Sequence, residues 1–439
     1  MRRDAGREAA IGLPQLLRGY WLAMAALTGL SILYTAAKVM LFHLKFPYGI
    51  GMLYDDSLWG DLLIFRPGFE HFRTPQFWSS FEYPFTYPAP LAVVLGILFR
   101  TTHPVKIYLL IEAFATSAAA WWFVRQLTAR TIPATIAWAF TLSTLVMTWP
   151  LLFLIDTANA EGFVIIVLAL GVYAVLCERC WLGAILIGVA GAMKIFPLIL
   201  LGLLLAKRRY KEFAAALVVA ALVTIASLAY VGPTIAEAQR HIDVGFALIQ
   251  NLYLYTMKPD AAALDHSLWV GVRYAAVYAD RLLHPVSAME QAAVVAVSLR
   301  IYLVAASAAG LALFFVRIRY LPPLNMVLAL TICAVLLPPL SLEYTLVHLL
   351  LPFALLCAYA IDMGQHGAAV EGGAAVEGLG ACFGCFAILF NIETFLSNRF
   401  IYAAEARTLA LLMLLWLVLR HPFPWVALER AASEGSATI

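Results

Sequence analysis

The sequence predicts an all-α polytopic membrane protein, and its composition gives the first evidence. Of the 439 residues, 63% are hydrophobic and only 13% are charged, about half the roughly 25% charged residues of soluble proteins. The mean hydropathy of +0.87 excludes a soluble globular domain, a disordered chain and a coiled coil. Since a spanning helix needs about 20 apolar residues, the apolar runs predict about 11–13 transmembrane helices within one integral membrane domain, residues 1–439.

The N-terminus predicts the orientation of the chain. Arg2, Arg3, Arg7 and Arg18 precede the first apolar stretch, and positive charge beside a first helix favours a cytoplasmic N-terminus. The stretch is too long for a signal-peptide core and has no convincing cleavage site. We therefore expect an uncleaved first helix over residues 19–42, in the plasma (inner) membrane.

Residues 43–87 form a polar loop that is then extracytoplasmic. The loop contains Asp55, Asp56 and Asp61 among many aromatic residues, such as Trp59 and Phe65. A flexible linker would be rich in Gly, Ser and Pro instead. This composition predicts short interfacial helices on the membrane surface, in what we interpret as a catalytic-type loop.

The rest of the chain divides into a helical core (88–231), a second outer loop (232–292), C-terminal helices (293–420) and a cytoplasmic tail (421–439). The expected spans are 88–102, 105–124, 131–148, 160–177, 181–206, 212–231, 293–316, 324–340, 345–361, 379–396 and 405–420. Lys207–Arg209 and Arg317 mark cytoplasmic turns. Arg125 and Arg130 also have cytoplasmic character, although a count from the first helix places them outside. Breaks at Pro150 or Lys194 would change that count.

The sequence contains neither a Walker motif nor a GxGxxG after a strand. An outward-facing group transfer would therefore need a donor that is itself lipid-linked. The net charge of +3 without a basic stripe argues against a nucleic-acid partner. Two C-x-x-C pairs, Cys177/Cys180 and Cys382/Cys385, lie in apolar sequence and fit helix packing better than a zinc site. We expect no cofactor, although Asp55 and Asp56 could bind a divalent cation.

Two ionisable residues are the first candidates for chemistry. Asp61 could act as a general base at the membrane surface, where a partly apolar setting raises a carboxyl pKa; alternatively it is a solvated loop charge or a helix cap. Lys194 is a lone cation in an apolar run, and such residues are costly and often functional. It could bind a lipid phosphate or snorkel to the interface.

The other ionisable residues allow several interpretations. Glu112 is expected to be paired inside the bundle, and Asp156 and Glu161 to lie in a short outer turn. Lys258 and Arg273 in the second outer loop could bind anionic headgroups or be solvated. His348 follows Tyr344 by one helical turn, so the two would share a face, in a structural or a catalytic role.

Five short motifs together resemble the C-type glycosyltransferase superfamily, and more narrowly glycosyltransferase family 87, the polyprenyl-phosphate-mannose-dependent mannosyltransferases. The resemblance runs from about residue 50 to 350. The motifs are GDLLIF (60–65), FTYPAP (85–90), DTANAEGFV (156–164), MKIFPLILLGLLLAKRRYKEF (193–213) and DHSLWVGVR (265–273). Each is short, and their order and spacing carry the likeness.

The resemblance implies a GT-C-like fold and assigns roles to particular residues. Asp61 would be the general base on the acceptor hydroxyl, and Lys194 and Arg273 would contact the donor phosphate, with Lys258, Tyr344 and His348 as further candidates. Asn159, Tyr87, Glu343 and Asp265 would line the cavity. In SLEYTLVH (341–348) the family often has a His after the acidic residue, where this chain has Tyr344. Either His348 serves one turn later or that phosphate contact is absent.

The predicted function is an inverting transfer of a mannose-like sugar from a polyprenyl-phosphate donor to a lipid or glycan acceptor, on the extracytoplasmic face. The alternative is a lipid or solute transporter or flippase without transferase activity, which would use Lys194, Glu112 and Asp156 as a polar pathway. The aromatic first loop and the lack of an internal repeat count against the transporter.

Overall fold

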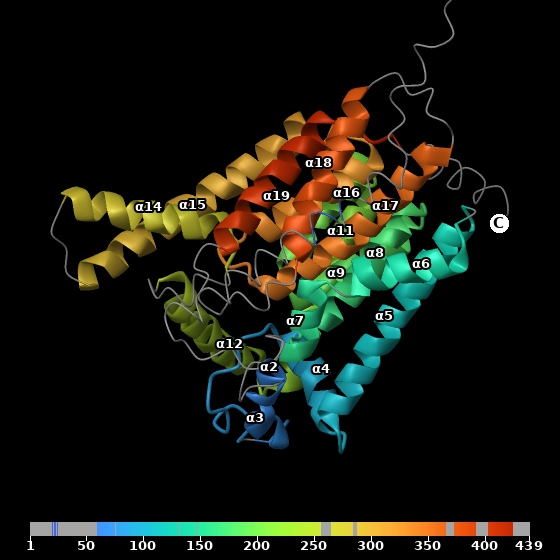
Figure 1. Cartoon of the computed structure of the whole chain (residues 1–439). Coiled ribbons are helices and arrows are strands. Elements are labelled where there is room, and N and C mark those ends of the chain that lie inside the picture. The colour runs from blue at the N-terminus through green and yellow to red at the C-terminus, as the bar shows by residue number, and fades with distance from the viewer. Residues whose placement is uncertain are drawn as a thin grey trace, which may run out of the picture.

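The chain folds into helices joined by short turns. The computed structural model describes Tyr20, Leu22, Met24 and residues 59–74, 76–130, 132–146, 148–255, 265–283, 288–365, 373–391 and 403–424. Within these residues the regular secondary structure is helical. Asp265 and Leu342 form an isolated antiparallel β-bridge. The predicted first helix lies outside the described residues except for those three positions. Figure 1 shows the arrangement of the helices.

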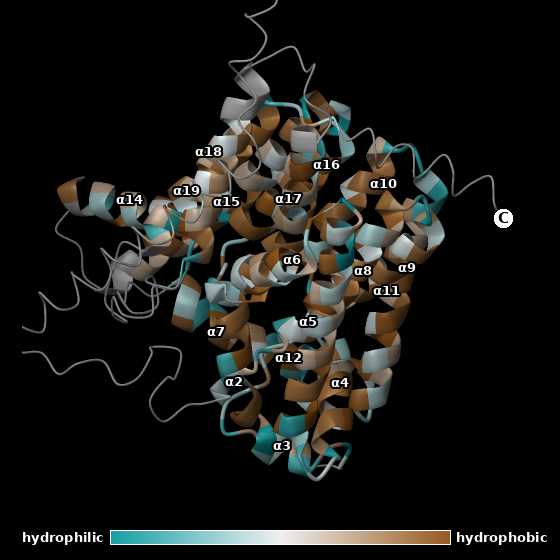
Figure 2. Cartoon of the chain, turned by 45° about the vertical axis from the view of Figure 1, so that its right-hand side comes forward, coloured by the Kyte–Doolittle hydropathy of each residue, from teal (hydrophilic) through white to brown (hydrophobic). Residues whose placement is uncertain are grey.

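Four described helical segments are long and apolar enough to cross a bilayer, which confirms the polytopic membrane class. They are α5 (Pro104–Thr128), α11 (Tyr210–Val231), α15 (Ala288–Val316) with its continuation to Tyr320, and η5 with α17 (Glu343–Leu349 and Leu350–Gln365). The 22 residues of α11 reach about 33 Å, against a hydrocarbon thickness of about 30 Å. In Figure 2 the ribbons of α11 and α17 are mainly brown (hydrophobic), and teal (hydrophilic) residues gather at α3 and in the turns beside α10.

Shorter apolar helices complete the bundle. They are α4 (Ala89–Phe99), α6 with η1 (Ala134–Thr141 and Leu142–Val146), α7 (Trp149–Thr157), α8 (Glu161–Leu176), α16 (Pro323–Leu336), α18 (Gly373–Phe390) and α19 (Ala403–Arg420). The 11 residues of α4 span only about 17 Å, so the sequence-based span over 88–102 is wrong. The core between α17 and α18 is aromatic: Phe353 packs against Phe383, Phe386 and Phe390.

The predicted span 181–206 is also wrong, because it is a helical hairpin. Helix α9 (Cys180–Met193) ends at Lys194, whose extended backbone (φ −149°, ψ 143°) reverses the chain into η2 (Phe196–Leu201) and α10 (Gly202–Ala206). Gly191 faces Leu198 across the hairpin. An ion pair between Lys207 and Glu178 closes its open end. The 14 residues of α9 reach about 21 Å, less than the hydrocarbon thickness of about 30 Å.

The basic turns gather at one end of the bundle, which we call the Lys207 end. Arg130, after α5, pairs with Asp362 near the end of α17. Arg317 donates to the carbonyl of Leu419 at the end of α19 (2.6 Å). Since α4 is too short to cross, α5 makes the crossing that brings Arg125 and Arg130 to this end. The short turn η4 (Ile318–Tyr320) follows α15 here.

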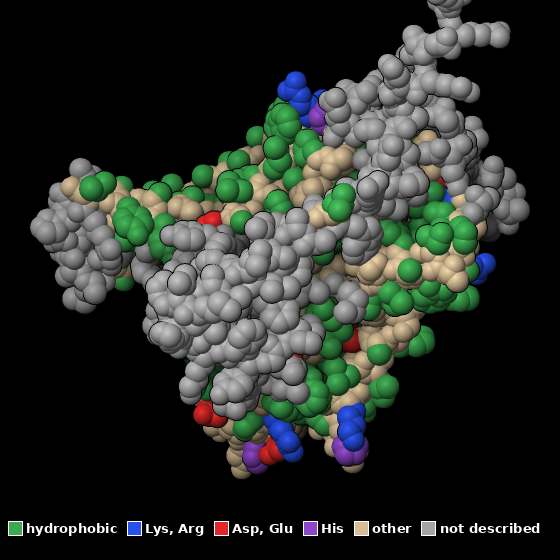
Figure 3. Space-filling model, in the orientation of Figure 1, with side chains coloured by type: hydrophobic (Ala, Val, Ile, Leu, Met, Phe, Trp, Pro, Cys, Tyr) green, Lys and Arg blue, Asp and Glu red, His purple; other side chains and the backbone are tan. Residues whose placement is uncertain are grey.

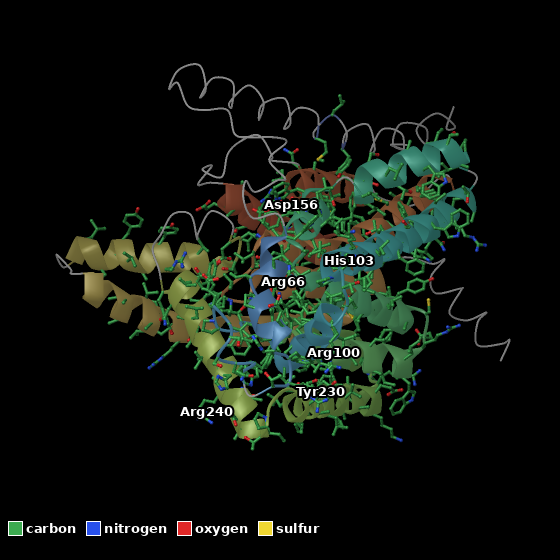
Figure 4. All side chains as sticks on the ribbon, turned by 90° about the horizontal axis from the view of Figure 1, so that it is seen from below. Arg66, Arg100, His103, Asp156, Tyr230 and Arg240 are labelled. Atoms are coloured by element: carbon green, nitrogen blue, oxygen red, sulfur yellow. The ribbon has the colours of Figure 1, made fainter. Side chains whose placement is uncertain are left out.

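The opposite end, called the Arg100 end, carries the turn between α4 and α5. Arg100 and His103 flank this turn, and Arg73 stacks on Tyr230 near the end of α11 (4.4 Å to the ring centroid). Lys, Arg and His side chains are visible at the lower tip of the molecule in Figure 3. Figure 4 views the molecule from this end, with Arg100, His103 and Tyr230 labelled.

The first loop folds as two short helices on an aromatic cluster, in agreement with the prediction of short helices between residues 43 and 87. They are α2 (Gly60–Leu63) and α3 (Arg66–Glu70). Phe65, Phe69 and Phe85 are buried between them and α4. The rings of Phe65 and Phe85 meet edge to face at 5.1 Å, an arrangement that aromatic pairs favour.

The second outer loop is helical as well. It contains α12 (Ile235–Ile249), η3 (Gln250–Leu254) and α14 (Leu268–Leu283). The hydroxyl of Thr234 accepts the N–H of Glu237 (3.2 Å) and caps α12. Gly245 of α12 lies directly against the backbone of Phe85 and Thr86, so α12 packs closely onto the chain that leads to Tyr87.

We expect Gly245→Ala to lower the thermal stability of the purified protein, because an added Cβ would overlap the Phe85 carbonyl. Overpacking of this kind costs about 1–3 kcal/mol. Gly271→Ala on α14 is the matched control, since nothing lies within 4 Å of the position of its Cβ. Equal unfolding temperatures for the two variants in detergent would contradict the close contact between α12 and the first loop.

Candidate functional site

Three turns inside the bundle meet at one cavity of about 1090 Å³. They are the turn between α7 and α8, the hairpin turn at Lys194, and residues 338–342 between α16 and η5. Pockets that hold small ligands usually measure about 300–1,000 Å³. Five residues predicted for the site line this cavity: Asp61, Tyr87, Asn159, Lys194 and Tyr344.

Asp61 is held in place by the turn between α7 and α8. The N–H of Trp59, at the start of α2, donates to the carbonyl of Asp156 (2.8 Å). The side-chain amide of Asn159 donates to Oδ2 of Asp61 (2.6 Å). The carboxylate of the first loop is therefore positioned by a residue almost 100 positions later in the chain.

The amide of Asn159 is fixed on each of its sides. Nδ2 also donates to the hydroxyl of Tyr87 (3.2 Å), and Oδ1 accepts the N–H of Glu161 (2.9 Å). The backbone carbonyl of Asn159 accepts the hydroxyl of Tyr108 (2.9 Å). Ala158 before it adopts a left-handed conformation (φ 50°), which is uncommon for a residue other than glycine. This amide holds Asp61 and Tyr87 together at the cavity.

The setting of Asp61 suits a general base. Burial raises the pKa of its carboxyl group above the ordinary value, while the hydrogen bond from Asn159 and the charge of Lys194 act in the opposite direction. A carboxylate with a raised pKa accepts a proton more readily. The hydrogen-bond donor beside it keeps the ionised form accessible.

Lys194 forms the second polar centre of the cavity wall. Its ammonium pairs with Oε2 of Glu161, and the other oxygen of that carboxylate contacts Nε2 of His348 (2.5 Å). The rings of Tyr87 and Tyr344 lie 5.7 and 5.1 Å from the Lys194 nitrogen, within the range of cation–π attraction. Lys194 therefore forms an internal ion pair with Glu161 and does not extend away from the bundle.

Comparisons with known proteins identify the family of this chain. The sequence model of glycosyltransferase family 87 matches residues 85–337, more than half of the chain. The chain belongs to glycosyltransferase family 87. No curated protein and no solved structure matches it. The family makes the protein a membrane glycosyltransferase, with a sugar donor and an acceptor as substrates.

The stretch matched to family 87 contains only part of the site. Tyr87, Asn159 and Lys194 lie within it, whereas Asp61 precedes it and Tyr344 follows it. Glu161 is the residue that sequence reasoning missed, because its place beside Asp156 suggested an outer turn. The available signals were its ionisable side chain in an apolar stretch and its two-residue separation from Asn159; neither indicates that Lys194 and His348 converge on it.

Asp265 joins two loops behind the cavity of this family 87 protein, instead of lining it. Its Oδ1 accepts the N–H groups of Ser267 and Ser341 (3.0 Å each). Burial raises the pKa of the Asp265 carboxyl group to about 6, although these hydrogen bonds act to lower it. Nε2 of the neighbouring His266 contacts the hydroxyls of Ser341 (3.1 Å) and Thr345 (3.2 Å). This cluster fixes the chain that leads to Tyr344.

Arg273 and Glu343 also lie behind the cavity wall. The guanidinium of Arg273 is buried and donates to the carbonyl of Tyr253, a cavity residue. Glu343 pairs with Arg407 and accepts the indole N–H of Trp149 (2.6 Å). Lys258, Asp55 and Asp56 lie outside the described residues. Among those described, no group of three or more His, Cys, Asp or Glu side chains is placed to hold a metal ion.

Arg407→Met is expected to destabilise the protein strongly, because the carboxylate of Glu343 would stay buried without its cation. Breaking a buried pair typically costs about 3–5 kcal/mol. The control is Arg66→Met, which removes the exposed ion pair with Glu70, worth about 0–1 kcal/mol. Thermal unfolding in detergent measures both variants, and similar losses for the two would contradict the expectation.

Proposed function

We propose that this protein transfers a mannose-like sugar from a polyprenyl-phosphate donor to a lipid or glycan acceptor, with inversion at the anomeric carbon. The supporting observation is that the carboxylate of Asp61 and the ammonium of Lys194 face one cavity. A base for the acceptor and a cation for the leaving phosphate are the two groups that such a transfer requires.

The reaction uses these groups in one displacement. The acceptor oxygen attacks the anomeric carbon while its proton passes to the carboxylate of Asp61. The bond between the anomeric carbon and the phosphate oxygen breaks, and its electron pair stays on that oxygen. Lys194 stabilises the charge that develops on the phosphate, and this attraction is strong at the edge of a low-dielectric region. Attack in line with the leaving group inverts the anomeric centre.

The apolar wall of the cavity supports a lipid-linked donor. Ile225 of α11, Phe246 of α12 and Ile195 beside Lys194 line the cavity and are exposed, Ile195 at 80%. Exposed apolar side chains favour contact with acyl or prenyl chains over contact with water. A polyprenyl chain could therefore lie along this wall with its phosphate at Lys194.

The larger number of basic turns at one end supports an extracytoplasmic active site. Arg130, Lys207 and Arg317 lie at the Lys207 end, and the positive-inside rule assigns such an end to the cytoplasm. The cavity lies on the far side of the α9 hairpin from Lys207. We place the protein in the plasma (inner) membrane, with both termini cytoplasmic and the first loop outside. The mechanism requires no cofactor.

Asp61→Asn is expected to abolish sugar transfer, because the amide cannot accept the proton of the acceptor hydroxyl. Purified protein would receive radiolabelled polyprenyl-phosphate sugars and candidate glycolipid acceptors. Asp243→Asn, an exposed change on α12, is the control that should keep full activity. Full transfer by Asp61→Asn would overturn the assignment of the base. Failure of the wild type to transfer any sugar, with solute flux in liposomes, would favour a transporter.

In Asn159→Ala, the acidic limb of the pH–rate profile should move to higher pH. Asp61 acts only when deprotonated, so kcat/KM falls as the pH falls through the pKa of its carboxyl group. The hydrogen bond from Asn159 lowers this pKa, and its loss raises the pKa further. Thr224→Ala, on the α11 wall of the cavity, should leave the limb in place. An unchanged or lower limb in Asn159→Ala would contradict this account.

A further inference from the structure

Glu161 is a buried carboxylate that reaches the cavity only through a neighbouring cation. Its side chain is fully buried, and it does not line the cavity. One of its oxygens pairs with Lys194, which does line the cavity and keeps 17% of its side chain exposed. The other oxygen contacts His348, which is buried. Neither catalysis by Asp61 nor phosphate contact by Lys194 requires an acidic group here.

An anion bound to Lys194 would lie close to Glu161. Two hydrogen-bonded contacts placed end to end separate their outer atoms by at most about 6 Å. Like charges at such a distance repel appreciably in a protein environment, where the effective dielectric constant is about 20. Glu161 therefore weakens anion binding at Lys194, and it does so more strongly as the charge of the anion increases.

The charge of the bound phosphate changes during the proposed reaction. The donor is a phosphodiester with one negative charge. Cleavage of its bond to the sugar leaves the electron pair on oxygen and yields a phosphomonoester, which carries about −1.5 to −2 at pH 7. Repulsion by Glu161 thus increases at the moment the sugar leaves.

We propose that Glu161 selects against the phosphomonoester product at Lys194 and so promotes its release after transfer. The inference rests on the proposed function, because it requires a lipid-phosphate donor. Glu161 is a positioning residue in this scheme: it holds Lys194 and His348 and sets the net charge beside the phosphate. The N–H of the same residue fixes Asn159 (2.9 Å), and a side-chain amide would leave that contact unchanged.

Equilibrium binding to the full-length protein in detergent tests the proposal without relying on catalysis. The probes are farnesyl phosphate, a monoester, and its methyl diester, which share the same prenyl chain. In Glu161→Gln the preference for the monoester over the diester should rise by about tenfold or more, as expected for one added charge near 6 Å. The control is Glu178→Gln, which removes a carboxylate paired with a lysine at the Lys207 end and should leave the ratio unchanged.

The ratio of affinities separates charge selection from a purely structural role. If Glu161→Gln weakens both probes equally, Glu161 only positions Lys194 and the proposal is overturned. The wild type gives a second test that does not depend on how the variant folds: it should bind the monoester no more than a few-fold more tightly than the diester. A wild-type preference above about tenfold also overturns the proposal. If the wild type binds neither probe, the polyprenyl-phosphate donor itself is wrong.

Discussion

The turn between α7 and α8 is the constraint on which the rest of the site depends. Three residues at this turn make the contacts. The carbonyl of Asp156 accepts the N–H of Trp59, and the side-chain amide of Asn159 donates to Asp61 and Tyr87. The carboxylate of Glu161 pairs with Lys194. Each contact links a different part of the chain to the same point. Because α7 and α8 are themselves held in the bundle, this turn converts helix packing into the relative positions of a carboxylate and an ammonium.

The membrane class and the approximate position of the site could be predicted from the sequence. Hydropathy is a property of each residue, so the apolar runs were recognisable, and the isolated charges Asp61 and Lys194 stood out against them. The motifs that resemble family 87 added Asn159 and Tyr87, which do line the cavity.

The remaining features depend on contacts between distant residues. Lys194 marked a possible break in the apolar run 181–206, but hydropathy alone could not distinguish one long helix from two short ones; the extended backbone at Lys194 decides it. Arg273 and Glu343 were expected at the substrate, yet neither lines the cavity. The guanidinium of Arg273 donates to the carbonyl of Tyr253, and Glu343 pairs with Arg407. Residue type alone cannot indicate whether a buried charge faces a ligand or a partner from another helix.

The hairpin of α9, η2 and α10 has a consequence for how the protein is inserted into its membrane. Both of its ends lie at the Glu178–Lys207 ion pair, so these 27 residues begin and end at the same end of the bundle. A hydropathy count treats them as one crossing and thereby reverses the assigned orientation of every later segment. The insertion machinery must instead accept the two short helices together, since neither is long enough to be anchored across the bilayer alone.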